Sequence, residues 1–233
     1  MNNNKLVSVI MATYNSSETI SVSLKSILDQ TYKNIELLVV DDCSIDNTYE
    51  ILDEYRKKYS QVRLFKNNEN IGLTKSLNFL INKSKGEFIA RQDSDDISNS
   101  DRIKKQLKFI YTNKLDGCTT RAFKNGTSVT PRISYYLPTK IVIKYKNPFV
   151  HGTLLIRKST IKKINNYDER FYYSQDYKLF TDLLNAGYKI SIMKDALYHL
   201  NTFNNISSKY KEEQKYYADC VRKRKNPLEE IIK

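Results

Sequence analysis

The sequence predicts an α/β fold in which a mixed, mainly parallel sheet carries helices on both faces. Short runs of Val, Ile and Leu alternate with segments of helical spacing over the first part of the chain. Strand, helix, strand, helix in this order is typical of right-handed crossovers between parallel strands. The runs have the length of buried strands and lie at residues 5–11, 35–40, 62–65 and 87–90.

The segments between these runs place apolar residues on one helical face. The first has the spacing i, i+4, i+7 and i+8, and two later segments repeat a similar pattern. Asp46 and Ser17 stand where residues that cap two of these helices are expected. The apolar positions are Ile20, Leu24, Ile27 and Leu28, then Ile51, Leu52, Tyr55 and Tyr59, then Leu73, Leu77, Leu80 and Ile81.

The pattern is less regular after about residue 113. Gly and Pro residues in 113–148 predict irregular strands and loops, with a β-like piece at 140–143. Residues 153–156 and 188–193 are strand candidates, and 175–186 is a helix with Gly187 at its C-cap. The polar tail from residue 204 is either a terminal helix or an arm.

Composition bounds the classes of protein. The 233 residues include 18 Tyr and 9 Phe, enough for a core, which excludes a disordered chain and fits one large domain with at most a small appendage. No apolar stretch has the length of a membrane-spanning helix, and the polar N-terminus lacks a secretory signal, so we expect a cytoplasmic protein. Cys43, Cys118 and Cys220 are scattered and suggest neither a disulfide framework nor a zinc site.

The formal net charge is +13, from 39 Lys and Arg against 26 Asp and Glu. Such a charge is compatible with nucleic acid, an anionic membrane surface or a phosphate-bearing substrate. It is also compatible with the Lys-rich and Asn-rich composition that an AT-rich genome produces in any protein.

Polar residues follow three of the predicted strands, where a doubly wound sheet binds its ligand. Residues 12–15 follow the first strand, 41–44 the second and 91–96 the fourth. Neither G-x-G-x-x-G nor a P-loop is present, which argues against a dinucleotide cofactor.

Three carboxylates, Asp93, Asp95 and Asp96, lie on the loop after the fourth strand. Clustered carboxylates repel one another unless a cation neutralises them, and Mg²⁺ or Mn²⁺ typically takes one or two carboxylates together with substrate phosphate oxygens. The alternative is that these aspartates cap a helix beginning near Asn99 or form a solvated loop.

Five segments in order give these features a context. They are 8–15 (SVIMATYN), 26–32 (SILDQTY), 36–48 (ELLVVDDCSIDNT), 70–73 (NIGL) and 86–96 (GEFIARQDSDD). These segments are distributed over nearly the whole of residues 5–110. In order and spacing they resemble the inverting nucleotide-sugar glycosyltransferases of family 2. The resemblance implies the Rossmann-like GT-A fold, with 1–203 as one domain, 1–112 its nucleotide-sugar-binding half, 113–203 its acceptor-binding half and 204–233 a basic tail or helix.

The resemblance also implies roles for individual residues. Tyr14 flanks a uracil and Asp42, helped by Asp41, accepts a hydrogen bond from the base; a half-buried Tyr14 with a satisfied hydroxyl is the alternative. Asp93 and Asp95 form the family's D-x-D motif, in which Asp93 contacts the ribose and Asp95 holds Mg²⁺ or Mn²⁺; Asp96 is either a further ligand of the metal or a residue that orients the loop. The full nucleotide-binding set implied in this way is Ala12, Thr13, Tyr14, Asn15, Asp41, Asp42, Lys75, Asp93 and Ser94.

An inverting transfer needs a general base for the acceptor hydroxyl. Residues 174–180 (SQDYKLF) are similar to the family's E/Q-D-Y segment, which implies that Asp176 is this base. The alternative is an N-terminal helix carboxylate stabilised by the helix dipole. Gln175 replaces the commoner glutamate and receives no role.

Three further residues are candidates for the acceptor or diphosphate region. His151 precedes a strand as a histidine does in many relatives, and His199 precedes residues 204–208, which resemble a loop that closes over the donor. Either can equally be an ordinary hydrogen-bonded histidine. Arg91, like Lys75, can contact phosphate or be a surface cation.

The expected activity is metal-dependent, inverting transfer of one sugar from a UDP-sugar to a saccharide or lipid-linked saccharide in surface glycan synthesis. A nucleotidyltransferase is the alternative enzyme, although the early Gly-rich phosphate loop of that class is absent. A nucleic-acid partner is not expected, because the predicted cleft is acidic. The basic tail suggests peripheral contact with the inner face of an anionic membrane, and a solvated helix face is the alternative.

Overall fold

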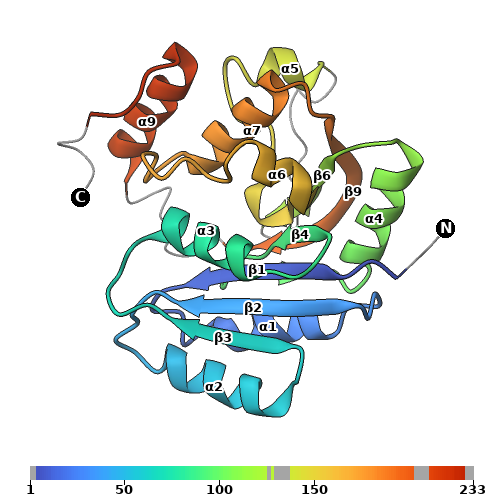
Figure 1. The fold of residues 1–233 in the computed structure, drawn as a ribbon, viewed down its shortest axis with the longest axis vertical. Coiled ribbons are helices and arrows are strands. Elements are labelled where there is room, and N and C mark those ends of the chain that lie inside the picture. Colours follow the sequence, from blue (N-terminus) through green and yellow to red (C-terminus); the bar gives the residue numbers. More distant parts are fainter. Residues whose placement is uncertain (1–3, 125–126, 129–136, 202–209, 229–233) are drawn as a thin grey trace.

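The computed structural model describes residues 4–124, 127–128, 137–201 and 210–228. Its strands form one nine-stranded sheet in the order β3-β2-β1-β4-β8-β6-β9-β5, and β7 pairs with β6 (Figure 1). The strands are β1 (Val7–Thr13), β2 (Ile35–Asp41), β3 (Val62–Lys66), β4 (Phe88–Arg91), β5 (Ile97–Ser98), β6 (Gly117–Lys124), β7 (Thr127–Ser128), β8 (Leu155–Arg157) and β9 (Ile190–Leu200).

The first four strands run parallel. Val9 of β1 is in register with Leu37 of β2 on one side and with Ala90 of β4 on the other. Three helices make the crossovers between these strands: α1 (Ile20–Leu28), α2 (Thr48–Lys58) and α3 (Leu73–Lys83). The parallel half and its helices confirm what the sequence pattern predicts.

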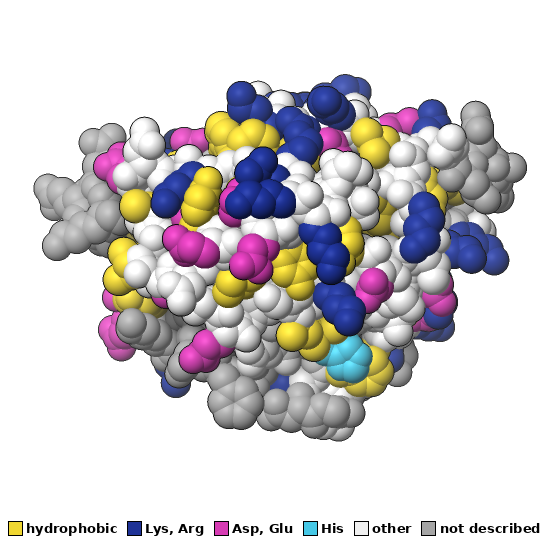
Figure 2. Space-filling view, turned by 90° about the horizontal axis from the view of Figure 1, so that it is seen from below, with side chains coloured by type: hydrophobic (Ala, Val, Ile, Leu, Met, Phe, Trp, Pro, Cys, Tyr) yellow, Lys and Arg dark blue, Asp and Glu magenta, His cyan; other side chains and the backbone are white. Residues whose placement is uncertain are grey.

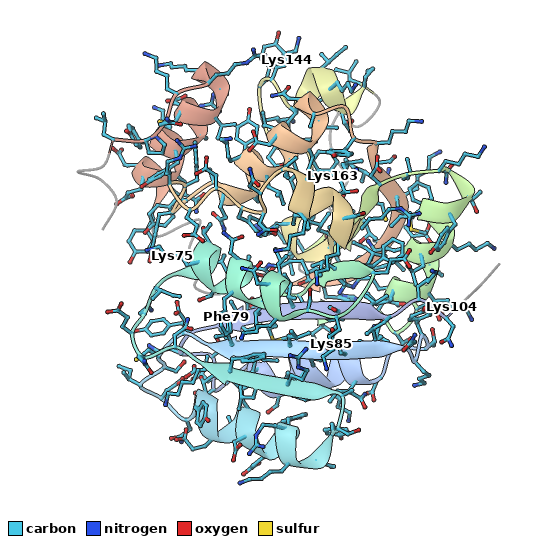
Figure 3. The ribbon with its side chains drawn as sticks, viewed as in Figure 1. Lys75, Phe79, Lys85, Lys104, Lys144 and Lys163 are labelled. Carbon is cyan, nitrogen blue, oxygen red and sulfur yellow. The ribbon has the colours of Figure 1, made fainter. Side chains whose placement is uncertain are left out.

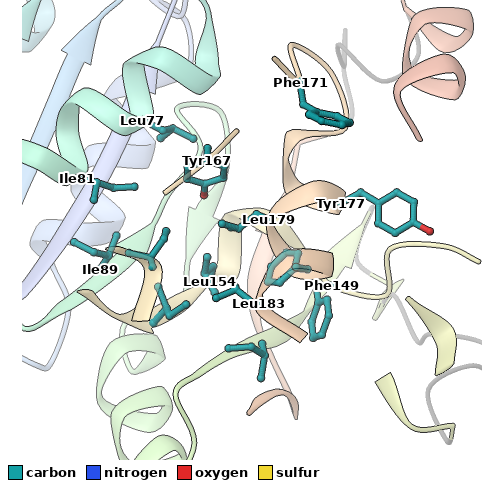
Figure 4. Packing of buried hydrophobic residues seen from close by; sticks show 14 of the residues in the cluster. Leu77, Ile81, Ile89, Phe149, Leu154, Tyr167, Phe171, Tyr177, Leu179 and Leu183 are labelled. Atoms are coloured by element: carbon teal, nitrogen blue, oxygen red, sulfur yellow. The ribbon is translucent and has the colours of Figure 1, made fainter. Parts of the chain in front are cut away.

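Alternate residues of β1 and β2 point to opposite faces of the sheet and enter two separate cores. Val9 and Leu37 pack with α1, α2 and α4 (Arg102–Thr112) on one face. Ile10 and Leu38 pack on the other face with α3, α6 (Lys158–Lys163) and α7 (Gln175–Asn185). Figure 4 shows this second core, where α3 and α7 contribute Leu77, Ile81, Leu179 and Leu183.

The remaining strands make the sheet mixed. β8 pairs antiparallel with β4 and with β6, and β9 runs parallel to β6. β9 also pairs with β5, which follows the acidic loop directly, so that Ile97 faces His199 and Ser98 faces Tyr198. The loop at 93–96 is therefore tied to strands from both halves of the chain.

Two strand predictions in the second half need correction. Residues 140–143 are not β-like, because α5 (Thr139–Val142) begins directly after Pro138 and buries Val142. Packing of this short apolar run overrides its β-branched composition. The strand predicted at 188–193 continues to Leu200 as β9, and a 3₁₀ turn, η2 (His151–Thr153), precedes β8.

The helix-cap predictions are met only in part. Asp46 accepts the backbone N–H of Thr48 at 3.0 Å, at the start of α2, although Asn47 occupies the N-cap itself. Ser17 caps no helix; its N–H donates to Asp46 at 3.1 Å, and Thr19 precedes α1. One carboxylate therefore joins the starts of two helices.

The basic C-terminal segment contains helix α9 (Lys211–Lys223). Tyr217, Cys220 and Val221 of α9 are buried in the core that α7 shares, so this part of the tail is not an arm; residues 204–209 and 229–233 lie outside the described residues. No helix within the described ranges is both long and apolar enough to cross a membrane. All three cysteines are free, as expected.

Candidate active site

Three polar loops meet where β1, β2 and β4 end. The Asn15 N–H donates to Ser44 Oγ at 2.9 Å, and the Ile45 N–H donates to Asn15 Oδ1 at 3.0 Å. The hydroxyls of Ser16 and Ser94 share a hydrogen bond of 3.0 Å. Parallel pairing of neighbouring strands thus brings residues 12–16, 41–45 and 93–96 together at one edge of the sheet.

The two aspartates after β2 are both buried and already hydrogen-bonded. Asp41 accepts bonds from the N–H and hydroxyl of Ser44. The Asp42 carboxylate accepts three bonds, from Asn67 Nδ2 at 2.6 Å, the Ile71 N–H at 3.0 Å and the Gly72 N–H at 2.8 Å. A carboxylate has about four acceptor sites, so Asp42 keeps capacity for one further donor.

Only glycine fits well at position 72, where the backbone N–H donates to Asp42. The φ of Gly72 is +84°, and a Cβ there would lie 2.7 Å from the ring of Tyr172. The bond to Asp42 therefore fixes the start of α3, the helix that carries Lys75 (Figure 3). The Lys75 side chain is exposed.

Tyr14 and its neighbours form the exposed rim of this edge. The Tyr14 side chain is 46% exposed, whereas Thr13 before it is buried and Ala12 is partly so. Asn15 has a φ of +49°, which turns the chain away from β1. The ring of Tyr14 is thus an open aromatic surface, and flanking a base remains a prediction.

An ion pair between the buried Arg91 and the partly exposed Asp93 organises the acidic loop. Arg91 Nη1 lies 2.6 Å from Asp93 Oδ1, and the Arg91 side chain is 1% exposed. Arg91 is therefore not the surface cation that the sequence left open. The Arg91 Nε has no hydrogen-bond partner among the described residues.

Asp95 and Asp96, the other two carboxylates of the loop, form no ion pair with any described residue. Burial, reinforced by the charges of Asp93 and Asp95, raises the pKa of Asp96 to about 8, although Asp96 Oδ1 accepts the Asn201 N–H at 2.7 Å. Burial and the charge of Asp93 also raise the pKa of Asp95. Both shifts show that negative charge here is costly without a neutralising partner.

These residues fit a divalent cation only as part of a ligand set. The described residues contain no cluster of three or more His, Cys, Asp or Glu side chains placed to hold a metal. A hard cation at Asp95 and Asp96 would complete its coordination with waters or phosphate oxygens, as Mg²⁺ and Mn²⁺ commonly do.

Side chains that the sequence analysis missed hold the loop in place. Gln92 Nε2 donates to the Asp96 carbonyl at 2.9 Å and the Asp93 carbonyl at 3.1 Å. The Asp93 N–H donates to the Tyr198 hydroxyl at 3.0 Å. Arg102, fully buried, donates to the Arg91 carbonyl at 3.1 Å, and its burial lowers its pKa to about 10.

Gly152 leaves the space that Asp93 occupies. A Cβ at this position would lie 2.5 Å from Asp93 Oδ2 and 2.5 Å from the Tyr198 hydroxyl. The second half of the chain therefore contacts the acidic loop through η2 and β9, and position 152 must be glycine for this contact.

The alternation of β9 separates His199 from the acidic loop. Tyr198 faces Asp93, so the next side chain points to the opposite face. His199 is exposed and stacks on Phe123 with ring centroids 4.9 Å apart. The residues 204–208 expected to form a closing loop lie outside the described residues, and a role for His199 remains a prediction.

His151 is a hydrogen-bonded, neutral histidine. Its Nε2 shares a 2.7 Å hydrogen bond with the Tyr167 hydroxyl. Burial, and then the charge of Arg91, lowers the pKa of His151 well below its usual value. His151 therefore borders the region around Arg91 without carrying charge there.

Asp176 lies in the first turn of helix α7, whose N-cap Ser174 has a φ of +52°, unusual for a residue other than glycine. Asp176 Oδ2 accepts a bond from Asn147 Nδ2 at 2.7 Å, and Oδ1 accepts the Tyr177 N–H at 2.7 Å. Burial raises the pKa of Asp176, while these bonds and the charge of Arg91 oppose the rise. Arg91 thus acts electrostatically on the acidic loop and on Asp176 together.

The fold and this edge of the sheet define a glycosyltransferase with the GT-A type of architecture. Residues 8–180 match the family model described as Glycosyl transferase family 2. The chain belongs to this family, and the resemblance found in its sequence is confirmed.

Relatives and solved structures agree with this assignment. The chain is 32% identical to the putative glycosyltransferase EpsE of Bacillus subtilis, covering 100% of this chain and 87% of EpsE. It is 31% identical to the UDP-Glc:alpha-D-GlcNAc-diphosphoundecaprenol beta-1,3-glucosyltransferase WfaP of Escherichia coli, covering 89% and 82%. Residues 1–349 of S. aureus TarS in complex with UDP match with a TM-score of 0.74 at 26% identity, covering 97% of this chain and 67% of that one. This chain spans 41% of the longer TarS chain.

The ion pair between Arg91 and Asp93 can be tested by a double-mutant cycle. Arg91→Met removes the only cation paired with Asp93 in the described chain, so we expect it to lower the free energy of unfolding by about 2 kcal/mol or more. Combined with Asp93→Asn, the cycle should give a coupling free energy of about 1–3 kcal/mol in urea denaturation. The Arg56–Asp53 pair, whose arginine is 47% exposed, changed in the same way, should give less than about 1 kcal/mol. Equal coupling for both pairs would contradict the organising role of Arg91.

Proposed function

We propose that the protein transfers a sugar from a UDP-sugar to a saccharide or lipid-linked saccharide, with inversion at the anomeric carbon and with Mg²⁺ or Mn²⁺. The observation that carries the proposal is the acidic loop after β4, where Asp95 and Asp96 have raised pKa values. The names of WfaP and of the TarS complex with UDP support a uridine donor and a lipid-linked acceptor.

The donor lies along the edge formed by the three loops. The exposed ring of Tyr14 flanks the base, and Asp42 accepts a bond from the base with its remaining capacity. Asp93, held by Arg91, contacts the ribose. The residues that surround the nucleotide in this arrangement are Ala12, Thr13, Asn15, Asp41, Lys75 and Ser94.

Asp95 and Asp96 would hold the divalent cation. A bound cation supplies charge stabilisation for the leaving diphosphate as the glycosidic bond breaks. The chain's own contribution is to hold the Asp96 carboxylate through the Asn201 N–H and the loop backbone through Gln92. A cation at this position also relieves the repulsion that raises the pKa of Asp96.

Asp176 accepts the proton of the acceptor hydroxyl as that oxygen attacks the sugar carbon. The raised pKa of Asp176 suits a general base better than that of an exposed aspartate. Asn147 and the Tyr177 N–H hold its two oxygens in a fixed direction. Arg91 lies close enough to both His151 and Asp176 to influence their pKa values, and we place the acceptor in this part of the site.

Peripheral contact with an anionic membrane on the cytoplasmic side is part of the proposal. Because α9 is packed into the core through Tyr217, deletion of residues 205–233 would disturb folding. The suitable test is therefore liposome cosedimentation of variants in which exposed lysines are replaced by neutral residues.

Donor binding can be measured by calorimetric titration of UDP. We expect binding with Mn²⁺ or Mg²⁺, at least tenfold weaker binding in EDTA, and loss of the metal effect in Asp95→Ala, because diphosphate and carboxylate share the cation. The exposed Asp195→Ala variant is the matched control and should bind like the wild type. UDP binding that is equally strong in EDTA would refute metal dependence.

The role of Asp176 predicts a pH dependence. The base must be ionised, so kcat/KM rises with pH through a raised pKa, and the acidic limb should lie above the usual aspartate value of about 4. Asp176→Asn should lower kcat by about 10²–10⁴-fold with UDP binding unchanged. Asp182→Asn, on the same helix, is the control and should keep its activity. Near-normal turnover in a folded Asp176→Asn protein would exclude this residue as the base.

A further inference from the structure

A cationic cavity lies beside Asp176, on the side facing α9. Its volume is about 440 Å³, and its lining includes Asp176 and Asn147 together with Lys146, Lys211, Lys215 and Arg222. None of the lining residues comes from the nucleotide-binding half of the chain. The cavity is therefore separate from the acidic loop, and it shares with the proposed chemistry Asp176 and the two residues that hold it, Asn147 and Tyr177.

The lysines of this cavity form no ion pairs with described residues, although the charge of Lys215 acts on Asp219. Lys146, Lys211 and Lys215 make no ion pair with any described residue, and Asp176 is the single carboxylate of the lining. Arg222 is paired with Asp219 and also donates to the Tyr145 carbonyl at 3.4 Å. Like charges gathered around one space repel one another, and an anion bound between them relieves the repulsion.

Helix α9 presents these cations on one face and is fixed by the other. Lys215 and Arg222 lie four and eleven residues after Lys211 along α9. This spacing places the three side chains on one face of the helix. Tyr217 on the other side packs against Phe171 and Tyr173, with ring centroids 6.1 and 5.8 Å apart. The Ser174 hydroxyl also donates to the Gln214 carbonyl at 3.1 Å.

The distribution of charge elsewhere supports a specific role for this cluster. Figure 2 shows the face at the α2 and β3 end of the molecule, where Lys and Arg are interspersed with Asp and Glu over most of the surface. At the cavity, by contrast, lysines from two separate segments converge on a carboxylate. Their convergence is thus not a simple consequence of the net charge of +13.

We propose that this cavity binds a phosphate or diphosphate group of the acceptor and so places the acceptor hydroxyl at Asp176. The inference rests on the proposed function, because it takes Asp176 as the base. A neutral saccharide gains little from three unpaired ammonium groups, whereas a phosphate ester gains several charge-assisted hydrogen bonds. The cavity thus selects acceptors that carry phosphate close to the reacting sugar.

The surroundings of the cavity favour a lipid as the source of this phosphate. Ile141 of α5 and Tyr145, three residues beyond the end of α5, are 48% and 72% exposed, and Tyr145 precedes Lys146 of the lining. Lys144 lies beside the same short helix (Figure 3). Exposed apolar side chains flanked by lysines are typical of a surface that contacts an anionic membrane.

The probe for the site is inorganic pyrophosphate, titrated calorimetrically in EDTA so that no cation bridges it to the acidic loop. We expect wild-type protein to bind it, with at least tenfold weaker binding in the double variant Lys211→Gln/Lys215→Gln. Lys104→Gln/Lys108→Gln is the matched control, since these are also exposed lysines four residues apart on a helix. No binding by the wild type, or equal loss in both double variants, would overturn the inference.

Two further arms separate the outcomes. UDP with Mn²⁺ should bind equally to wild type and Lys211→Gln/Lys215→Gln. If the wild type binds UDP but not pyrophosphate, only the inference about the cavity is overturned. If it binds pyrophosphate but not UDP, the proposed function is overturned. Farnesyl diphosphate identifies the source. Binding that is tighter than that of pyrophosphate, and weakened by Ile141→Ser/Tyr145→Ser, supports a lipid carrier, while equal binding contradicts the lipid source and assigns a water-soluble phosphate.

Discussion

The contact between the buried Arg91 and Asp93 is the interaction on which the site depends. The guanidinium is 1% exposed and lies at the end of β4, where the parallel half of the sheet meets the mixed half. A buried cation requires a nearby anion, and the anion it finds belongs to the acidic loop. Arg102 holds the Arg91 carbonyl, and Gly152 leaves room for the Asp93 carboxylate. The ion pair therefore fixes the position of the loop relative to the second half of the chain.

This arrangement concentrates charge of both signs in a small region. Two carboxylates of the loop, Asp95 and Asp96, are left with raised pKa values, and Asp176 has a raised pKa on the other side of Arg91. Perturbed pKa values are common at functional sites, because such sites contain charged groups that lower the stability of the folded protein but serve its function. In the proposed function, a divalent cation supplies the positive charge that the carboxylates of the loop lack.

The regular half of the fold could be predicted from sequence, because β1 to β4 and α1 to α3 each carry their own periodicity. The loops after β1, β2 and β4 followed from strand order alone. The rest depends on tertiary contacts: residues 140–143 have strand-like composition but form α5, and β9 continues past its clear alternation because it pairs with β6 and β5. Tyr198 rather than His199 faces Asp93 for the same reason, since strand phase decides which neighbour points inward.

We propose that the acidic loop after β4 binds the diphosphate of a nucleotide-sugar through a divalent cation. A crystal structure of the protein with UDP and Mn²⁺, with anomalous diffraction data collected at the manganese edge, would show whether it does. We expect one anomalous peak in contact with Asp95 or Asp96 and with the diphosphate, and the uracil beside Tyr14. A nucleotide bound at the same edge without manganese, or manganese bound away from this loop, would contradict it.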